Sequence, residues 1–446
     1  MIYRKWGSNK DFVIKYTSSL DSDKYIIEEV KLVMKVHVIE LFLSKYIDEN
    51  VASSIIKSIN SFTMDEKGEF EDIHEALEAY ILKQLGEVGG WIGLGRSRND
   101  HVATALRIKM RNEIIDILEK MLNFRKNIIS NAEANLETII PSFTHFQPAQ
   151  PTTLAHYFLY IEEELSSRWE TLFSILKLVN RSPLGSGAIV GSNIALNRLR
   201  EAEMLGFESI IENTLYATST RSDLISAVNE MCLTLVSLSR IAEDLILLSS
   251  KFVGILMLPD THVSTSSLMP QKRNAVTMEI LRSKAGVCIG IVSTLLSVYK
   301  SLPSGYNLDL QELNSYYWKI TEDLKDAIEV LNDILLGLKV LKEYDDKEFL
   351  STDVAEIRSV REGKPYRKIY NEIVEKIRAG VFIAEMSPLD SIKLKKVEGS
   401  PNPEFLKISI KNASKRVEDH ENMLKSYKER IQLGLAQLRA IENELM

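Results

Sequence analysis

The stretch DHVATALRIKMRNEIIDILEKMLNFRKNIISNAEANLETII, residues 100–140, runs for about forty residues without a proline or a glycine. Its apolar side chains recur at spacings of three and four residues, which is the period of an amphipathic helix. A helix of this length without internal caps is longer than most helices of globular proteins and is typical of bundles. The stretch therefore predicts a long helix in a helical bundle.

Four further segments have the same helical character: residues 152–180, 224–250, 275–302 and 315–344. Each is apolar over more than half of its circumference, so each helix needs burial on several sides. A bundle extended by other subunits would supply that burial. Strand signals are few, and the glycine-rich residues 182–192 are interpreted as a loop or a short hairpin.

The predicted fold class is all-α, with three helical domains, which fits a chain of 446 residues. Residues 1–96 and 350–446 are more charged and contain shorter helices. We interpret them as two smaller domains that flank a central bundle formed by residues 97–349.

Composition excludes several classes of function. A net charge of −7 argues against nucleic-acid binding as the main function. The two cysteines, Cys232 and Cys288, lie in apolar helical stretches and have no metal-ligand spacing, as expected of buried thiols in a cytoplasmic protein. The longest apolar run, residues 285–299, is shorter than a membrane span and is predicted to be a buried helix.

Polar motifs interrupt the long helices. GLGRSRND (93–100) precedes the longest one, where Asn99 or Asp100 could simply cap the helix. Alternatively, Arg96 and Arg98 could form an anion site with the helix N-terminus. Three more polar motifs are SFTHFQPAQPTT (142–153), STSSLMPQKRN (264–274) and GYNLDLQELN (305–314). Each motif alone has a structural explanation, as a solvent-exposed loop or the turn before a helix.

Together, the order and spacing of GRSRND, THFQPAQP, SPLGSGA, SSLMPQKRN and YNLDLQE resemble the argininosuccinate lyases of the aspartase/fumarase superfamily. The resemblance runs from Ser19 to TDVAEIRSVREGKPYR (352–367). It implies a homotetramer whose central bundle is shared by four chains and whose active sites each combine three chains. It also implies cleavage of L-argininosuccinate to L-arginine and fumarate in arginine biosynthesis, without a metal or an organic cofactor. The charge and the short apolar run had already argued against nucleic acid and membrane as partners.

The resemblance further implies roles for individual residues. Ser266 would take the carbon proton, while Lys272 and Asn274 would stabilise the doubly charged intermediate. His145, oriented by Glu279, would protonate the leaving nitrogen, although which of Ser266 and His145 is acid or base stays open. The residues that match family substrate contacts are Ser19, Arg98, Asn99, Thr144, Asn274, Tyr306 and Gln311. His74 matches a further polar position, where a structural histidine is nearly as good an interpretation.

Some positions depart from the family pattern. Leu94 stands where a threonine is usual, and Asn314 replaces a lysine that would pair with a substrate carboxylate. Because these changes fall on the substrate side, two alternatives stay open. One is a sister lyase that releases fumarate from another substrate, such as adenylosuccinate. The other is a structural protein that keeps the fold without the activity.

Overall fold

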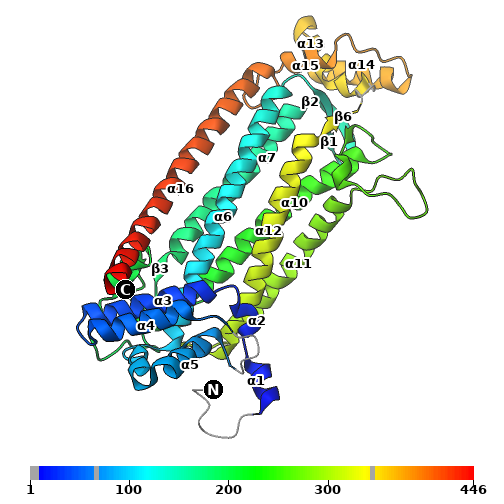
Figure 1. Ribbon diagram of the computed structural model, residues 1–446. Helices are drawn as coiled ribbons and strands as arrows, with labels where there is room; N and C mark the ends of the chain where they lie inside the picture. The colour runs from blue at the N-terminus through cyan, green and yellow to red at the C-terminus, as the bar shows by residue number, and fades with distance from the viewer. Residues whose placement is uncertain (1–9, 65–69, 342–346) are drawn as a thin grey trace.

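The computed structural model describes residues 10–64, 70–341 and 347–446, and shows an elongated helical bundle with a smaller helical unit at each end (Figure 1). The bundle consists of five long helices: α6 (Arg98–Ala134), α7 (Leu154–Val179), α10 (Ser222–Ser249), α11 (Val276–Tyr299) and α12 (Glu312–Gly337). These correspond to the five predicted helices, so the expectation of a mostly helical fold is confirmed. Residues 342–344 of the last predicted segment lie outside the described residues.

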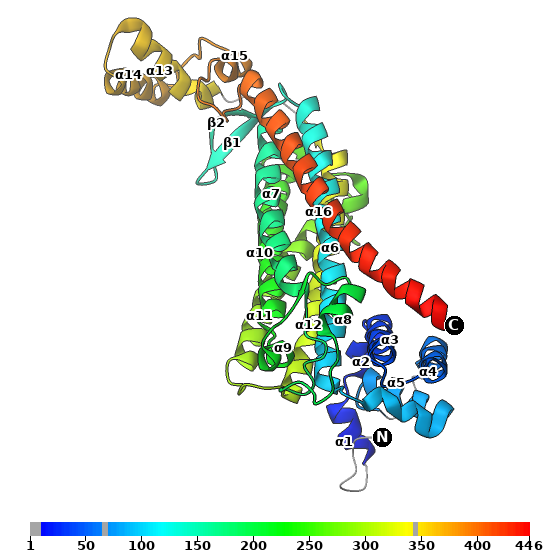
Figure 2. The ribbon, with the colours of Figure 1, turned by 90° about the vertical axis from the view of Figure 1, so that its left-hand side faces the viewer.

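One end of the bundle carries the N-terminal helices. They are α1 (Asp11–Thr17), α2 (Leu20–Asp23), α3 (Ile27–Leu43), α4 (Glu49–Ser61), α5 (Ile73–Leu85) and the 3-10 helix η1 (Gly86–Gly93). α8 (Arg198–Met204) and α9 (Thr214–Ser219) lie toward the same end (Figure 2), and η3 (Leu308–Gln311) directly precedes α12. This end therefore collects the turns that precede α6, α10 and α12.

The opposite end carries a small unit made of η4 (Lys347–Leu350), α13 (Ser351–Glu362), α14 (Tyr366–Arg378) and α15 (Pro388–Lys393). η2 (Asp260–His262) lies between α10 and α11. From the small unit, α16 (Pro403–Leu445) runs back along α6 and α7 (Figure 2). Trp169 of α7 stacks on His420 of α16 at 4.0 Å between ring centroids. The division at residues 96 and 349 stays a prediction.

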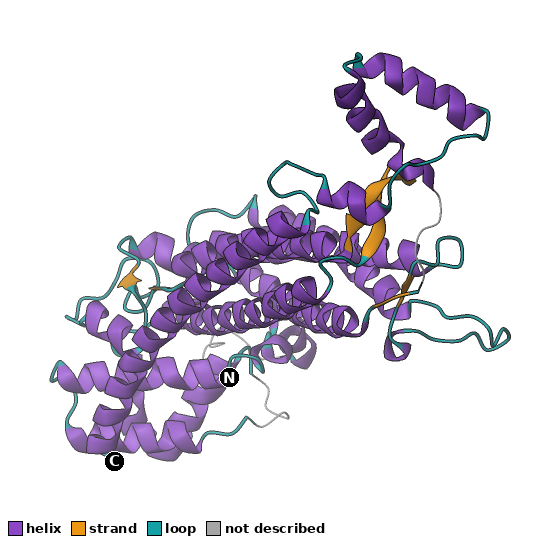
Figure 3. Ribbon diagram, turned by 90° about the horizontal axis from the view of Figure 1, so that it is seen from above, coloured by secondary structure: helices purple, strands orange, loops and turns teal. Residues whose placement is uncertain are grey.

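Strands form only three two-stranded pairs in the described part of the chain (Figure 3). They are the antiparallel hairpin β1 (Ile139–Thr144) and β2 (Gln147–Thr153), the parallel pair β3 (Arg181–Ser182) and β4 (Ser209–Ile210), and the antiparallel pair β5 (Leu256–Met257) and β6 (Lys339–Val340). The predicted hairpin within residues 182–192 does not form, because Ser182 pairs with Ile210 instead. The rest of that segment is a loop, the other interpretation.

The apolar helix α11 differs from its prediction as a buried helix. It is long and apolar enough to cross a membrane, yet one helix of this kind is weak evidence for a span, since core helices pass the same test. Only 28% of its most apolar window is buried within one chain. Ile280, Val287, Ile289 and Leu296 are each about half exposed, so this surface is left uncovered by the chain itself.

Candidate active site

The start of α6 places two predicted anion-binding residues at the N-terminal end of the bundle. Ser97, rather than Asn99 or Asp100, is the N-cap: its hydroxyl accepts a bond from the Asn99 amide at 3.2 Å, and Asp100 completes a capping box. Arg98 pairs with Asp72 at 3.1 Å and with Glu71 at 3.2 Å. The arginine is thus held at the helix N-terminus, where the backbone amides also favour anions.

Ser19 and Tyr306 lie beside this arginine. The Ser19 hydroxyl donates to Asp23 at 2.8 Å, and Asp23 also accepts the amide of Ile73 at 3.1 Å. Burial and the neighbouring Asp72 raise the pKa of Asp23 to about 7. Burial also raises the pKa of Tyr306. Its hydroxyl interacts electrostatically with Arg98, Asp72 and Asp23. The sequence analysis missed both aspartates, for which the only signal was their closeness in sequence to Ser19 and His74.

Asn99 and Gln311 connect this region to other loops. The Asn99 side chain donates to the carbonyl of Ala188 at 3.3 Å, and the next residue, Asp100, accepts the amide of Gly187 at 2.9 Å. The GRSRND and SPLGSGA motifs are therefore joined by two hydrogen bonds. Gln311 donates from its amide to the carbonyl of Thr17 at 3.0 Å. Five predicted substrate contacts thus gather at one end of the bundle.

His145 and Thr144 lie at the opposite end, at the tip of the β1–β2 hairpin. The sequence alone allowed a solvent-exposed loop or the turn before a helix for their motif. That helix, α7, does begin directly after β2, but the tip projects away from it. His145 and Phe146 form the two-residue turn with φ of 55° and 59°, which defines a type I′ hairpin. Because neither residue is glycine, the turn costs of order 1 kcal/mol or more per residue. Such a strained position is typical of a functional site.

The predicted catalytic loop lies at this end too, just before α11. Ser264 and Asn274 form an isolated β-bridge, with backbone hydrogen bonds of 2.9 and 2.8 Å, which closes the neck of the loop. Inside the loop, the Ser266 hydroxyl accepts the amide of Leu268 at 3.2 Å, and Lys272 is exposed. Glu279 lies in the first turn of α11 and is also exposed.

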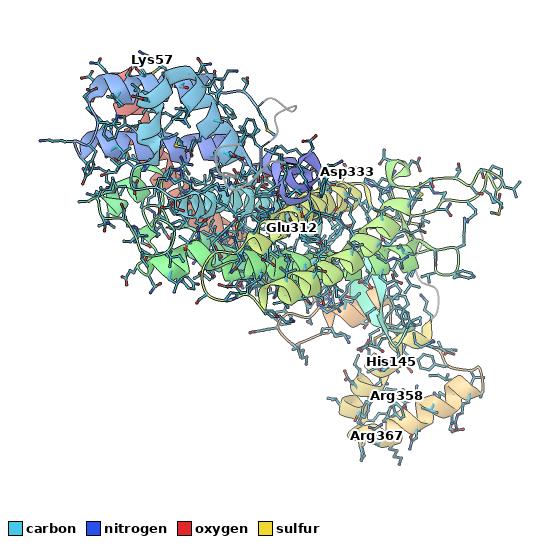
Figure 4. All side chains as sticks on the ribbon, turned by 90° about the horizontal axis from the view of Figure 1, so that it is seen from below. Lys57, His145, Glu312, Asp333, Arg358 and Arg367 are labelled. Carbon is cyan, nitrogen blue, oxygen red and sulfur yellow. The ribbon has the colours of Figure 1, made fainter. Side chains whose placement is uncertain are left out.

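One chain does not bring the predicted residues into one site. In the described residues, no hydrogen bond or ion pair joins His145 to Ser266, Lys272 or Glu279. α10 alone, with 28 residues, spans about 40 Å between the two ends of the bundle. Seen from below, His145 lies on the side of Arg358 and Arg367, whereas Lys57 in the N-terminal helices lies on the opposite side (Figure 4).

A buried polar cluster lies behind Arg98. Arg96, 3% exposed, pairs with Glu78 at 3.0 Å and is surrounded by His37, His74 and His101. Burial, followed by Arg96, lowers the pKa of all three histidines, to about 4 for His37 and about 3 for His74. His74 is therefore a neutral core residue. Across residues 10–64, 70–341 and 347–446, no group of three His, Cys, Asp or Glu side chains is arranged to hold a metal ion.

Comparison with known proteins identifies the family. Residues 15–290 match the lyase family. The chain is 58% identical over 446 residues to argininosuccinate lyase of Sulfurisphaera tokodaii, with both chains covered completely. It is 40% identical over 451 residues to argininosuccinate lyase of Pyrococcus furiosus, covering 96% of this chain and 98% of the relative.

Two solved structures share the fold. EDDS lyase in complex with formate matches with a TM-score of 0.83 at 20% identity, covering 98% of this chain and 96% of that chain. Class II fumarase from Schistosoma mansoni matches with a TM-score of 0.68 at 16% identity, covering 87% and 96%. The identity to curated relatives over the full length and the match to the lyase family show that the chain belongs to the argininosuccinate lyase family.

Proposed function

We propose that the protein is a carbon–nitrogen lyase that eliminates fumarate from L-argininosuccinate and releases L-arginine, in arginine biosynthesis. The observation that carries this proposal is the 58% identity to a curated argininosuccinate lyase over the whole length of both chains. No observation favours adenylosuccinate or a purely structural role. A cytoplasmic location stays a prediction.

The reaction removes a proton from a carbon next to a carboxylate and then breaks the bond to the guanidinium nitrogen. The intermediate carries a second negative charge on that carboxylate, so catalysis depends on donors and cations placed around it. Lys272 and Asn274 are two positions apart in the 264–274 loop, whose neck is closed by the bridge between Ser264 and Asn274. We assign them to this carboxylate.

Ser266 takes the carbon proton in the proposed mechanism. A serine hydroxyl is a weak base unless its alkoxide is stabilised by a cation or by amides. The amide of Leu268, which already donates to the Ser266 oxygen, and Lys272 of the same loop supply this stabilisation. His145, on the strained hairpin tip, donates a proton to the leaving nitrogen, directly or through water, with Glu279 as its orienting carboxylate.

Ser19, Asn99, Tyr306 and Gln311 bind the substrate at the other end of a chain. Arg98 and the N-terminal amides of α6 favour substrate carboxylates there. Glu71 and Asp72, which pair with Arg98, place carboxylates in that region as well, which suits a substrate that has both an ammonium and a guanidinium group.

Several chains must then share a site, because about 40 Å of helix separates the substrate residues from His145 and Ser266. We propose a homotetramer. A large apolar side chain is exposed to solvent in each of the segments 142–153, 264–274 and 182–192 of a single chain. These side chains are Phe146, 77% exposed, Leu268, 84%, and Val190, 91%. On α11, a side chain added at Gly286 or Gly290 would meet no atom within 4 Å, so another helix can approach closely along this half-exposed apolar surface.

The activity is tested by mixing the purified protein with argininosuccinate and with adenylosuccinate in parallel and following fumarate by its absorbance. Fumarate release from argininosuccinate alone is expected. Release from adenylosuccinate alone would assign the sister reaction, and no release from either would support the structural role. The tetramer is tested by the mass of the native particle.

A further inference from the structure

Asp353, in the first turn of α13, joins three separate parts of the chain. It is 4% exposed and accepts hydrogen bonds from the Ser391 hydroxyl of α15 at 2.6 Å and from the Gln150 amide of β2 at 3.4 Å. It also accepts the ammonium group of Lys395, which follows α15. This buried carboxylate accepts hydrogen bonds from three donors, one of them charged. Removing it would destabilise this region, because each donor would lose its partner.

Gln150 connects this carboxylate to the hairpin that carries His145. The pairing of β1 with β2 shifts register between Pro141 and Phe143, and Ser142 fills the irregularity. The Ser142 hydroxyl donates to the Gln150 carbonyl at 2.7 Å and accepts the Gln150 amide at 3.1 Å. Gln150 is therefore fixed to β1 through its backbone and to α13 through its side chain.

The surroundings of this contact are open. A cavity of about 620 Å³, lined by Ser142, Gln150 and Lys395 among others, lies under the hairpin. A second cavity of about 580 Å³ is lined by Asp353, Ser391 and Lys395. α13 and α14 have a separate small apolar core of Val354, Ala355, Ile369 and Ile373. β2 contacts η4 and α15 of the small unit, and between the two cavities the polar contacts of Asp353 tie it to α13, so they help to set the angle of the hairpin.

Small changes in that angle are amplified at the tip. β2 begins at Gln147, and His145 lies about one step beyond it in the turn, so the tip is about 13 Å from Gln150 along the hairpin. A tilt of about 4° at Gln150 therefore moves His145 by about 1 Å. A misplacement of about 1 Å can lower a rate by about 10²-fold even when the altered residue is far from the chemistry.

We propose that Asp353 is a positioning residue for His145, holding the hairpin at the angle at which the imidazole reaches the leaving nitrogen. This inference rests on the proposed function, in which His145 donates a proton. It gives a role to TDVAEIRSVREGKPYR, a motif whose side chains take no part in the chemistry. Removing the contact should lower kcat while KM stays nearly unchanged, because Ser19, Asn99 and Gln311 lie at the other end of the chain. Thr144 is the one substrate contact proposed on the hairpin itself.

The test uses three single variants and one exchange in the whole assembled protein. Asp353→Asn removes the charge, and Gln150→Glu places a second carboxylate against Asp353. Gln150→Ala removes only the hairpin contact and leaves the bonds of Asp353 to Ser391 and Lys395, so it should fold even if the others do not. The double variant Asp353→Asn/Gln150→Glu exchanges the amide and the carboxylate and restores one hydrogen bond between β2 and α13.

Each single variant should lower kcat at least about tenfold with KM within about twofold, and the double variant should recover at least about threefold over Gln150→Glu. Lys393→Ala is the matched control. Lys393 also links α15 to the chain ahead of the hairpin, through Glu137 at 3.0 Å, but both partners are about half exposed and such pairs contribute little. Its kcat should be unchanged.

Unchanged kcat in Gln150→Ala and Asp353→Asn, together with a lower melting temperature, would show that Asp353 only stabilises the fold and would overturn the inference. So would a failure of the exchange to recover kcat in a folded tetramer. Lack of turnover by the unmodified protein would instead reject the proposed function. The two failures are therefore distinguishable.

Discussion

Glu201 should make the stability of the protein depend on pH. The residue lies in α8, is 0% exposed, and has no hydrogen bond to either carboxylate oxygen among the described residues. Burial, reinforced by the neighbouring Glu40, raises its pKa to about 8. His37 Nδ1 lies 3.9 Å away, but the lowered pKa of His37, about 4, keeps the imidazole neutral. Between pH 5 and pH 7 the two groups are therefore neutral neighbours rather than an ion pair.

The sign follows from proton binding. An unfolded glutamate loses its proton near pH 4.5, whereas folded Glu201 keeps it to about pH 8. The folded state thus binds the extra proton, so this contribution to stability is fully present below pH 4.5 and is lost as pH rises to about 8. At about 1.4 kcal/mol per pH unit, the whole window sets an upper limit of about 5 kcal/mol, of which about 3 kcal/mol is lost between pH 6 and pH 9.

Glu201→Gln keeps the shape of the protonated acid and removes its titration. Melting temperatures are measured at pH 6 and pH 9 for the unmodified protein, for Glu201→Gln and for the control Glu203→Gln, which changes an exposed residue of the same helix. At about 1 °C per kcal/mol for a chain of 446 residues, Glu201→Gln should lose up to about 3 °C less than the other two between the two pH values. Other buried acids titrate alike in all three proteins, so the same loss in all three would refute the reasoning.

Three further predictions concern the proposed site. Ser266→Ala should still assemble and bind argininosuccinate but turn over at least about 10²-fold more slowly; near-normal turnover would exclude Ser266 as the base. His145→Ala and Ser266→Ala proteins, each inactive, should regain activity when dissociated and reassembled together, and no recovery in mixed tetramers confirmed by mass would place each site within one chain. Asn314 is 3% exposed, and its Oδ1 has no hydrogen-bond partner among the described residues. Asn314→Lys should add a cation for a substrate carboxylate and lower KM about fivefold, or about 1 kcal/mol. An unchanged KM would mean that another cation already pairs with that carboxylate.

Periodicity was a reliable guide to the long helices, because burial on a bundle imposes it directly. The end of the first helix was less predictable. It stops at Ala134 rather than continuing to residue 140, since Ile139 and Ile140 pair with Thr153 and Thr152 in a sheet. That pairing depends on contacts that the local pattern does not contain.

The hairpin itself could not be predicted from local rules. Pro148 and Pro151 argue against a strand, and the turn residues His145 and Phe146 are not the asparagine and glycine that a type I′ turn favours. His145, the proposed proton donor, stands where the backbone prefers asparagine. Likewise, the motifs pointed to one site, while the fold distributes them over two ends of a chain. Their separation became visible only in three dimensions.

The β-bridge between Ser264 and Asn274 has a consequence for the entropy of each catalytic cycle. Ordering a free loop costs roughly 1–2 kcal/mol for every residue whose backbone is fixed. The bridge joins the two ends of the 264–274 loop in the folded chain. The conformational entropy of closing the loop is therefore lost when the protein folds and not again in each cycle. A loop closed in this way can swing as a preformed unit about the residues that flank its neck. Less of the free energy of substrate binding is then consumed in ordering the chain, and more remains to orient Ser266.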